Sequence, residues 1–264
     1  MLNTNPFAML TEVLSPFAMQ SFIIIMVVLI ALGTIIQMIK HKNLTYFLNN
    51  AKKAKLQATR EISTSERVSI LAKTTVVDIG TTSELGFGKR RLSHVLGMYG
   101  TIIFWVSSAM LVFCYTGADK PSSSIWSMLW HIGAILTCIG GYWFWLFLRV
   151  DVSAEAHPWY RIIKADLFVL ALLACSTFGL AWSYTQFNGQ VGLSFLFLTL
   201  FIISNLVLFG GVYWSKFAHM FYKPGAAIQK NLAEADGSRD NLPPLADAPK
   251  QFGLGIKREQ PKHY

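Results

Sequence analysis

Two histidines lie where long apolar segments meet polar sequence. His94 follows the three cations of GKRRLSHVLGMYGTIIFW, and His219 lies in VYWSKFAHMFYKP at the end of another apolar segment. An imidazole one helical turn inside hydrocarbon needs a partner or a metal, because an unsatisfied polar group there costs several kcal/mol. Two neutral imidazoles from different helices at equal depth are the usual axial pair of a haem in a helical bundle. We therefore predict that His94 and His219 hold the iron of one b-type haem.

Small residues accompany both histidines at helical spacing. Gly97 follows His94 by one turn, and Ser215 and Gly211 precede His219 by one and two turns. Small residues stacked beside a histidine leave a slot for a flat macrocycle, which predicts that these residues line the haem. The same residues also suit plain packing of helix against helix. An interface histidine can likewise be a simple anchor, so both interpretations stay open.

Other polar residues at the same membrane face extend this prediction. Arg90 and Arg91 stand at the interface, where they are placed to meet the haem propionates. His157 precedes Pro158, a residue that favours the first turn of a helix, so His157 is expected to cap the following apolar segment. It is also the alternative iron ligand if one of the predicted pair does not bind the metal.

A second group of candidate residues lies toward the opposite face. His131 has no second histidine near it, but Trp126, Trp130 and Tyr115 lie in the neighbouring sequence. An imidazole can exchange the proton of a quinol, so these four residues predict a quinone pocket. Aromatic residues at an interface also form an ordinary belt, and this interpretation stays open.

The composition indicates an integral membrane protein. The 264 residues are 53% hydrophobic and 14% charged, with a mean hydropathy of +0.43. The net charge of +9 comes from cations that flank apolar segments, which indicates membrane topology and anionic lipid rather than nucleic acid. Cys114, Cys138 and Cys175 all lie in apolar segments without a CxxC pair, so any iron–sulfur relay must belong to another subunit.

Five apolar runs are long enough to span a bilayer, which predicts an all-α membrane protein. The expected spans are residues 22–39, 92–115, 127–148, 165–184 and 191–219, the last helix continuing past His219. Residues 1–224 would then form the membrane domain, and 225–264 an extended tail rich in Pro, Gly, Asp and Lys. In the polar loop 40–91 we expect an amphipathic helix on the membrane surface, and Ser63 with Glu66 has the spacing of a capping box.

The basic residues predict an orientation. With the amino terminus outside, every Lys and Arg except Lys120 falls on the cytoplasmic side together with the carboxyl terminus. No basic start typical of a secretory signal precedes the first apolar run, so we expect a multi-pass protein of the cytoplasmic (inner) membrane. At the inner boundary Asp166 is expected to pair with Arg161. The span interiors are almost free of charge and show no inverted repeat, which argues against the alternative of a small transporter.

The predicted arrangement resembles a known family. Five spans with histidines near the ends of the second and fifth are similar to the cytochrome b membrane subunits of respiratory nitrate reductase (its gamma subunit) and of heterodisulfide-reductase-like complexes. The strings KRRLSH, EAHPWYRIIKADLF and YWSKFAHMFYKP look most like the membrane anchor proposed for dissimilatory adenylylsulfate reductase. The resemblance covers approximately residues 10–224.

The resemblance implies an anchor that docks a cytoplasmic iron–sulfur flavoenzyme and exchanges its electrons with the quinone pool. The partner would be the alpha and beta subunits of adenylylsulfate reductase, acting in sulfur oxidation. The family's inner ligands would fall on His94 and His219. Relatives with two haems have a second histidine pair, whereas only His131 lies outward here, so the resemblance implies one haem b. A haem-free structural anchor of the same complex is the alternative.

Overall fold

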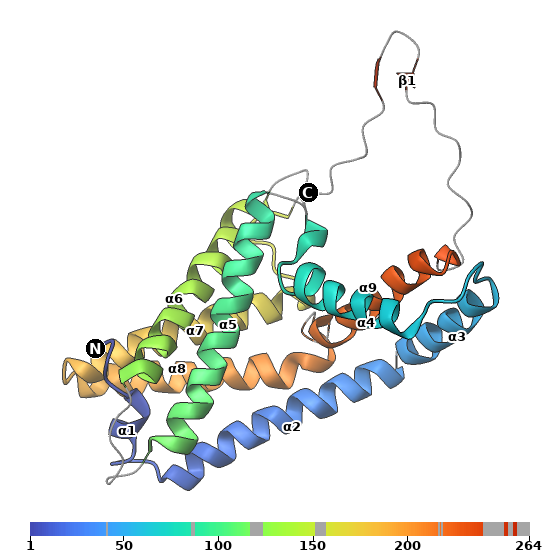
Figure 1. Ribbon diagram of the computed structural model, residues 1–264. Helices are drawn as coiled ribbons and strands as arrows, with labels where there is room; N and C mark the ends of the chain where they lie inside the picture. Colours follow the sequence, from blue (N-terminus) through green and yellow to red (C-terminus); the bar gives the residue numbers. More distant parts are fainter. Residues whose placement is uncertain are drawn as a thin grey trace. The chain divides into compact units, whose positions relative to one another are not determined.

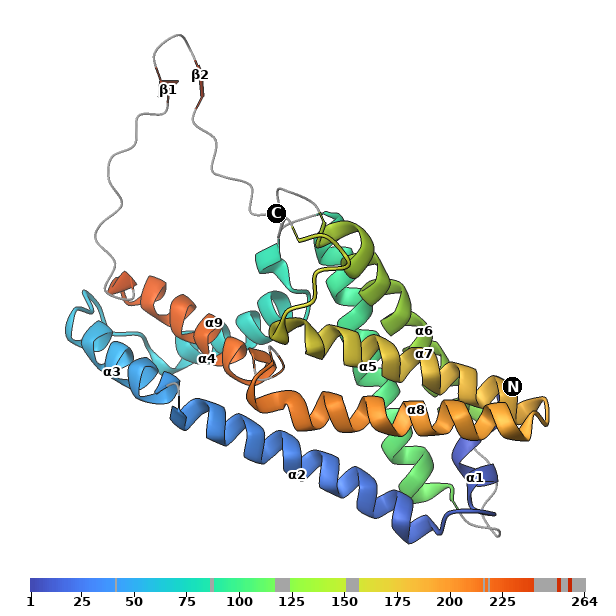
Figure 2. The same cartoon turned by 180° about the vertical axis from the view of Figure 1, so that it is seen from behind.

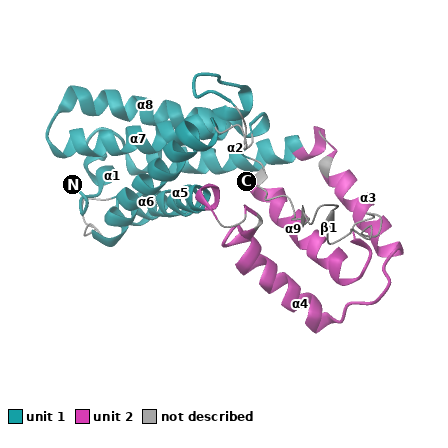
Figure 3. Cartoon of the chain, turned by 90° about the horizontal axis from the view of Figure 1, so that it is seen from above, with its two compact units in different colours: residues 1–37, 92–218 teal, residues 38–91, 219–264 magenta. Residues whose placement is uncertain are grey.

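The chain is almost entirely helical (Figure 1). The computed structural model describes residues 1–40, 42–85, 88–116, 124–150, 157–215, 217, 219–239, 251–252 and 256–257. It divides into two compact units, Met1–Gln37 with Leu92–Ala218 and Met38–Arg91 with His219–Tyr264 (Figure 3). We call the first the bundle unit and the second the polar unit.

The bundle unit contains helices that are long and apolar enough to cross a membrane, and the described residues hold five of them, as predicted. At a rise of about 1.5 Å per residue, a helix of 23 to 26 residues exceeds the roughly 30 Å of a hydrocarbon core. A short helix, α1 (Pro6–Leu10), precedes them. The five are α2 (Pro16–Lys40), α5 (Lys89–Cys114), α6 (Ser124–Trp143) with the π-helical turn η3 (Phe144–Leu148), α7 (Leu167–Phe187) after the 3₁₀ turn η4 (Lys164–Asp166), and α8 (Val191–Gly210).

The last span ends earlier than predicted. Instead of continuing past residue 219, α8 gives way to a 3₁₀ turn, η5 (Gly211–Tyr213), and a separate helix, α9 (His219–Ala235), begins after it. Two adjacent glycines, Gly210 and Gly211, weaken the helix at this point because glycine loses the most backbone entropy in a helix. The hydroxyl of Ser215 accepts a bond from Phe217 N at 3.3 Å, which competes with helical hydrogen bonding.

Part of the predicted extended arm is helical. Helix α9 carries residues 225–235 of it, so that part of the prediction is wrong. The segment QKNLAEA consists mainly of good helix formers, which explains the helix. Further on, β1 (Gln251–Phe252) pairs antiparallel with β2 (Ile256–Lys257). Residues 240–250, 253–255 and 258–264 of the predicted arm lie outside the described residues.

Helices α5 and α6 cross with their backbones in close contact. A Cβ atom added to Gly100 would lie 2.5 Å from Thr137 N, and one added to Gly133 would lie 2.5 Å from Phe104 N. The hydroxyl of Ser93 donates to the carbonyl of Gly140 at 2.8 Å across the same contact. Small residues permit this approach, which supplies packing between helices that hydrophobicity alone does not supply inside a bilayer.

Aromatic rings fill the core of the bundle unit beside this crossing. Phe7 of α1 contacts Trp130 and Trp182 edge to face, with ring centroids 5.9 and 5.4 Å apart. Trp182 stacks on Phe201 at 5.8 Å, and Phe104 contacts Trp130 at 5.1 Å. Helices α7 and α8 run side by side (Figure 2). The ring contacts link α5 and α6 to these two helices in one aromatic cluster.

The polar unit is built from two distant stretches of sequence. It contains α3 (Asn43–Leu56), α4 (Thr64–Lys73), the π-helix η1 (Thr74–Ile79), the 3₁₀ turn η2 (Ser83–Leu85) and α9. The predicted loop 40–91 is therefore largely helical. Ser63 caps α4 as predicted, its hydroxyl accepting from Glu66 N at 3.2 Å, but the Glu66 carboxylate pairs with Arg60 at 2.5 Å and does not complete the capping box.

Hydrogen bonds tie α9 to the loop helices. The amide of Asn231 donates to Thr74 Oγ1 at 2.7 Å and to Asp78 Oδ2 at 2.8 Å, and the Ser83 hydroxyl donates to Asp78 Oδ1 at 2.6 Å. These donors stabilise the carboxylate and hold the pKa of Asp78 below its usual value. The predicted division into a membrane domain 1–224 and a tail 225–264 thus differs from the observed units, because α9 packs with residues 38–91.

We predict that Gly140→Ala loosens the α5–α6 crossing. The added methyl would meet the carbonyl oxygen of Ser93 at 2.6 Å, and backbone atoms cannot rotate away from it. Overpacking of this kind costs about 1–3 kcal/mol, so the thermal midpoint of the detergent-solubilised protein should fall by several degrees. Gly192→Ala, at a site with open space, is the matched control and should leave the midpoint unchanged.

We further predict that the polar unit loosens in acid through Asp78. Because the folded-state pKa of Asp78 lies below its ordinary value of 3.8, its contribution to stability is complete above that value and is lost as the pH falls through the folded-state pKa. Pepsin digestion between about pH 2.5 and 4.5, with cleavage sites mapped by mass spectrometry, should show faster cutting in α9 at the acid end. Pepsin should cut the Asp78→Asn variant fast at every pH in this range. A pH profile in that variant identical to that of wild type would contradict the role of the carboxylate.

Candidate functional site

The structure leaves space beside the first predicted iron ligand. His94 lies in the second turn of α5, and more than a third of its surface is exposed. Gly97, one turn further along, presents an open side, since no described atom lies within 4 Å of a Cβ added there. The backbone of Gly97 packs against Gly140 of α6 at the same time. Gly97 therefore serves helix packing and also leaves room on the His94 side of α5.

The second predicted ligand lies in the other unit. His219 is the first residue of α9 and belongs to the polar unit, whereas His94 belongs to the bundle unit. The side chain of His219 is outside the described part of the chain. Gly211 is buried in η5, and Ser215 is buried with its hydroxyl bonded to Phe217 N. The pairing of His94 with His219 remains a prediction.

The predicted propionate partners sit at the start of α5. Arg91 donates from Nε to Thr81 O at 2.8 Å and from Nη2 to Thr81 Oγ1 at 2.7 Å, so its guanidinium fixes the turn that leads into the helix. Arg90 is half-buried. A guanidinium has five N–H donors, and Arg91 uses both its Nε and its Nη2 for Thr81.

His131 cross-links two helices of the bundle. It is fully buried, with Nδ1 2.7 Å from the Ser127 carbonyl and Nε2 2.7 Å from the Ser183 hydroxyl of α7. A neutral imidazole has one donor and one acceptor, so the ring donates to the carbonyl through Nδ1 and accepts the serine proton at Nε2. Both ring nitrogens therefore have protein partners in this arrangement.

Of the other three residues of the predicted quinone pocket, Trp130 contacts the His131 ring edge to face, with ring centroids 4.9 Å apart. Trp130 is fully buried and donates from Nε1 to Ser108 Oγ at 2.9 Å. Trp126 is half-buried, and the carbonyl of Tyr115 accepts from Asn5 Nδ2 at 3.2 Å. None of the four predicted residues lines an apolar cavity that lies elsewhere in the bundle unit.

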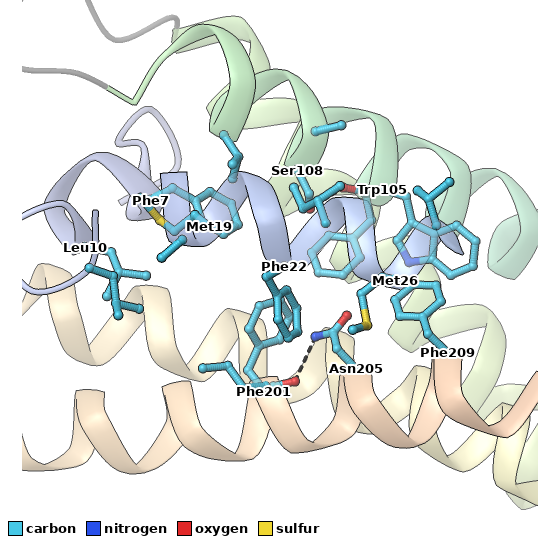
Figure 4. A pocket seen from close by; sticks show the side chains of 18 of the residues that line it. Phe7, Leu10, Met19, Phe22, Met26, Trp105, Ser108, Phe201, Asn205 and Phe209 are labelled. Atoms are coloured by element: carbon cyan, nitrogen blue, oxygen red, sulfur yellow. Dashed lines mark hydrogen bonds between the residues drawn. The ribbon is translucent and has the colours of Figure 1, made fainter. Parts of the chain in front are cut away.

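This cavity, of about 400 Å³, lies between α1, α2, α5 and α8 (Figure 4). Its lining is apolar except for the polar groups of Trp105, Ser108 and Asn205. Helix α2 touches the bundle on either side of it, because Gln20 lies 3.5 Å from Val112 O and a Cβ added to Gly33 would lie 2.9 Å from Val212 Cβ. The described lining residues are Phe7, Leu10, Leu14, Ala18, Met19, Phe22, Ile23, Met26, Val27, Ile30, Phe104, Trp105, Ser108, Ala109, Val112, Leu198, Phe201, Ile202, Asn205 and Phe209.

A buried ion pair connects the end of η3 to the start of α7. Arg149 is 0% exposed, and its Nη2 lies 2.5 Å from Asp166 Oδ2. The same guanidinium donates to Pro158 O at 2.9 Å and to Arg161 O at 2.7 Å, and it lies 4.2 Å above the ring of Trp145. The guanidinium therefore joins the end of η3 to residues 158–166 before α7.

The predicted pairing of Asp166 with Arg161 is wrong. Arg161 contributes its carbonyl, and Arg149 is the ion-pair partner of Asp166. Asp166 also accepts from Ile163 N at 2.9 Å, which caps η4. Sequence proximity favoured Arg161, whereas the signal for Arg149 was its place directly after the apolar run FWLFL, where the chain must turn.

His157, the alternative iron ligand, lies in this connection. Its backbone N–H donates to Arg149 O at 3.1 Å, and its side chain is half-buried. The Nδ1 atom is buried without a hydrogen-bond partner among the described residues. The ring precedes α7 by several residues, so it does not cap that helix directly as predicted.

No protein-family model, no curated protein and no solved structure matches the chain.

We predict that Asp166→Asn strongly destabilises the bundle unit. Removing one partner of a buried ion pair leaves an uncompensated charge, which costs about 3–5 kcal/mol. The purified variant should show a markedly lower thermal midpoint and faster proteolysis between residues 149 and 166. Lys164→Gln, which removes an exposed charge two residues away, should behave as wild type. Equal midpoints for Asp166→Asn and wild type would show that the Arg149 ion pair contributes little.

Proposed function

We propose that this chain is the membrane anchor and electron-transfer subunit of a quinone-linked oxidoreductase complex. It would join a cytoplasmic iron–sulfur flavoenzyme, adenylylsulfate reductase in sulfur oxidation, to the quinone pool through one b-type haem. The observation that carries the proposal is the apolar cavity within helices long enough to span a membrane. A cavity of this size and lining suits a lipophilic small molecule.

The polar unit supports the anchoring half of the proposal. It presents exposed cations on α3 and α4, among them Lys52, Lys53, Lys55 and Arg67. A basic surface attracts an acidic partner and raises its association rate. Because α9 and the loop helices form one compact unit, these cations lie on the surface of a folded structure. We propose that the acidic partner is the soluble flavoenzyme.

The residues near His94 fit a haem as far as they are described. Its exposed imidazole and the open side of Gly97 leave space on one face of α5. His94 and His219 would hold the iron, with His157 as the alternative ligand, and Arg90 and Arg91 would meet the propionates. A bound haem supplies one-electron transfer. The α5–α6 crossing holds α5 in place, and it would thereby position the backbone of His94 for the haem.

The haem is tested by the spectrum of the purified full-length protein. We expect a reduced-minus-oxidised α band and one haem per chain by pyridine haemochrome assay. His94→Ala and His219→Ala should each lose most of the band, because one axial ligand is removed. His157→Ala tests the alternative ligand: it should keep the band if His94 and His219 hold the iron, and loss of the band in this variant would make His157 a ligand instead.

The outcomes separate the two forms of the proposal. Absence of an α band in the wild-type protein, after expression with ample haem supply, would overturn the haem. If that protein still recruits the flavoenzyme to membranes, the chain is a haem-free structural anchor. Solute flux in liposomes without a redox partner would instead indicate a transporter and overturn both forms.

A further inference from the structure

We propose that Trp105 and Asn205 form the head-group site of a neutral quinone in the cavity between α1, α2, α5 and α8. The identity of the ligand as a quinone rests on the proposed function. The location of the site rests on the geometry of the cavity. The hydrocarbon tail of the quinone would lie along α2, toward Phe7 and Leu14. The site differs from the one that the sequence predicted around His131.

Asn205 presents a polar atom to the cavity. The residue is 8% exposed, and its Nδ2 donates to the Phe201 carbonyl of its own helix at 2.8 Å. No described residue bonds to its Oδ1, which Figure 4 shows turned away from that carbonyl and beside Met26. An amide has two donor hydrogens and an acceptor oxygen, so Asn205 can still both accept and donate one hydrogen bond.

Trp105 contributes an unused donor to the same cavity. Its Nε1 is buried and has no hydrogen-bond partner among the described residues. The indole contacts Phe209, with ring centroids 5.2 Å apart, and Phe209 lies one turn after Asn205 on α8. The donor of α5 therefore lies about one helical turn from the amide of α8 along the same cavity. A buried indole N–H usually finds a partner, so its lack of one within the protein points to a ligand.

The third polar residue has its bonds within the protein. The Ser108 hydroxyl donates to Phe104 O at 2.8 Å and accepts from Trp130 Nε1 at 2.9 Å. Its only hydrogen is therefore used. This contrast singles out Trp105 and Asn205 as the polar groups still available to a ligand.

The chemistry of the lining defines the class of ligand. No described lining residue is ionisable, so a charged ligand would lose its hydration without compensation. A quinone carbonyl can accept from the indole and from the amide, and a quinol hydroxyl can donate to Asn205 Oδ1. The rest of the lining is aliphatic and aromatic, which suits an isoprenoid chain. A glycerolipid with a hydroxyl or ester oxygen shares this chemistry and is the competing occupant.

The first measurement identifies what the cavity holds. The full-length protein, purified in mild detergent, is extracted and its bound lipids are quantified by mass spectrometry. We expect quinone in near-stoichiometric amount, lost in Ala109→Phe, in which the larger ring fills the cavity. Recovery of a glycerolipid in its place, not displaced by decylubiquinone, would overturn the proposal.

The second measurement tests the two polar groups. Immobilised protein is incubated with a series of decylubiquinone concentrations, and the retained quinone is extracted and quantified. Trp105→Phe and Asn205→Leu should each weaken binding about five-fold, the factor expected for one hydrogen bond of ordinary net strength. Thr199→Val, which removes an exposed hydroxyl from the same helix, and Trp159→Phe, which removes an exposed indole, are matched controls and should bind as wild type.

The outcomes separate this inference from the proposed function. Equal affinity in wild type, Trp105→Phe and Asn205→Leu would overturn the head-group site even if the α band of the haem is present. Weakened binding in both variants of a protein that lacks the α band would support the site and refute the haem. Because Asn205→Leu removes a polar group from an apolar environment, it should not unfold the protein, and an unchanged thermal midpoint checks this.

Discussion

The close crossing of α5 and α6 is the contact on which the bundle unit depends. Inside a bilayer, lipid tails are as apolar as leucine, so helices associate through packing and hydrogen bonds. Gly100, Gly133 and Gly140 bring the two backbones together, and the Ser93 hydroxyl bonds across the contact. The position of α5 determines where His94 and Trp105 stand. The haem prediction and the quinone proposal therefore both rely on these glycines.

Buried polar side chains fix the other helices around this pair. His131 joins α6 to α7 through Ser183, and the ion pair of Arg149 with Asp166 closes the connection between the same helices. Each of these groups has protein partners, as buried polar groups require. Trp105 Nε1 is one of several buried polar atoms without a partner within the described chain, and no described residue bonds to Asn205 Oδ1. These two residues line the same apolar cavity, which is the reason to look for a ligand there.

The sequence allowed the helical fold class and the five long apolar helices to be predicted, because apolar length is a strong and local signal. It was less informative where distant segments meet. The helix break at Gly210 was missed because the apolar pattern runs on past it, although two glycines marked the place. The Asp166 partner was misassigned because Arg161 is nearer in sequence, whereas the ion pair is made by Arg149, seventeen residues away. The cavity could not be predicted, since it depends on how four helices pack.

The two-segment construction of the polar unit constrains how the protein is made. Helices α3 and α4 leave the ribosome early, but their partner α9 follows all five long helices in the chain. Thr74 Oγ1 and Asp78 Oδ2 therefore receive the hydrogen bonds of Asn231 only after all five long helices have been made. The polar unit can therefore be complete only after α9 has been synthesised and released. A partner that recognises this unit would bind chains in which α9 has been made and would ignore shorter nascent chains.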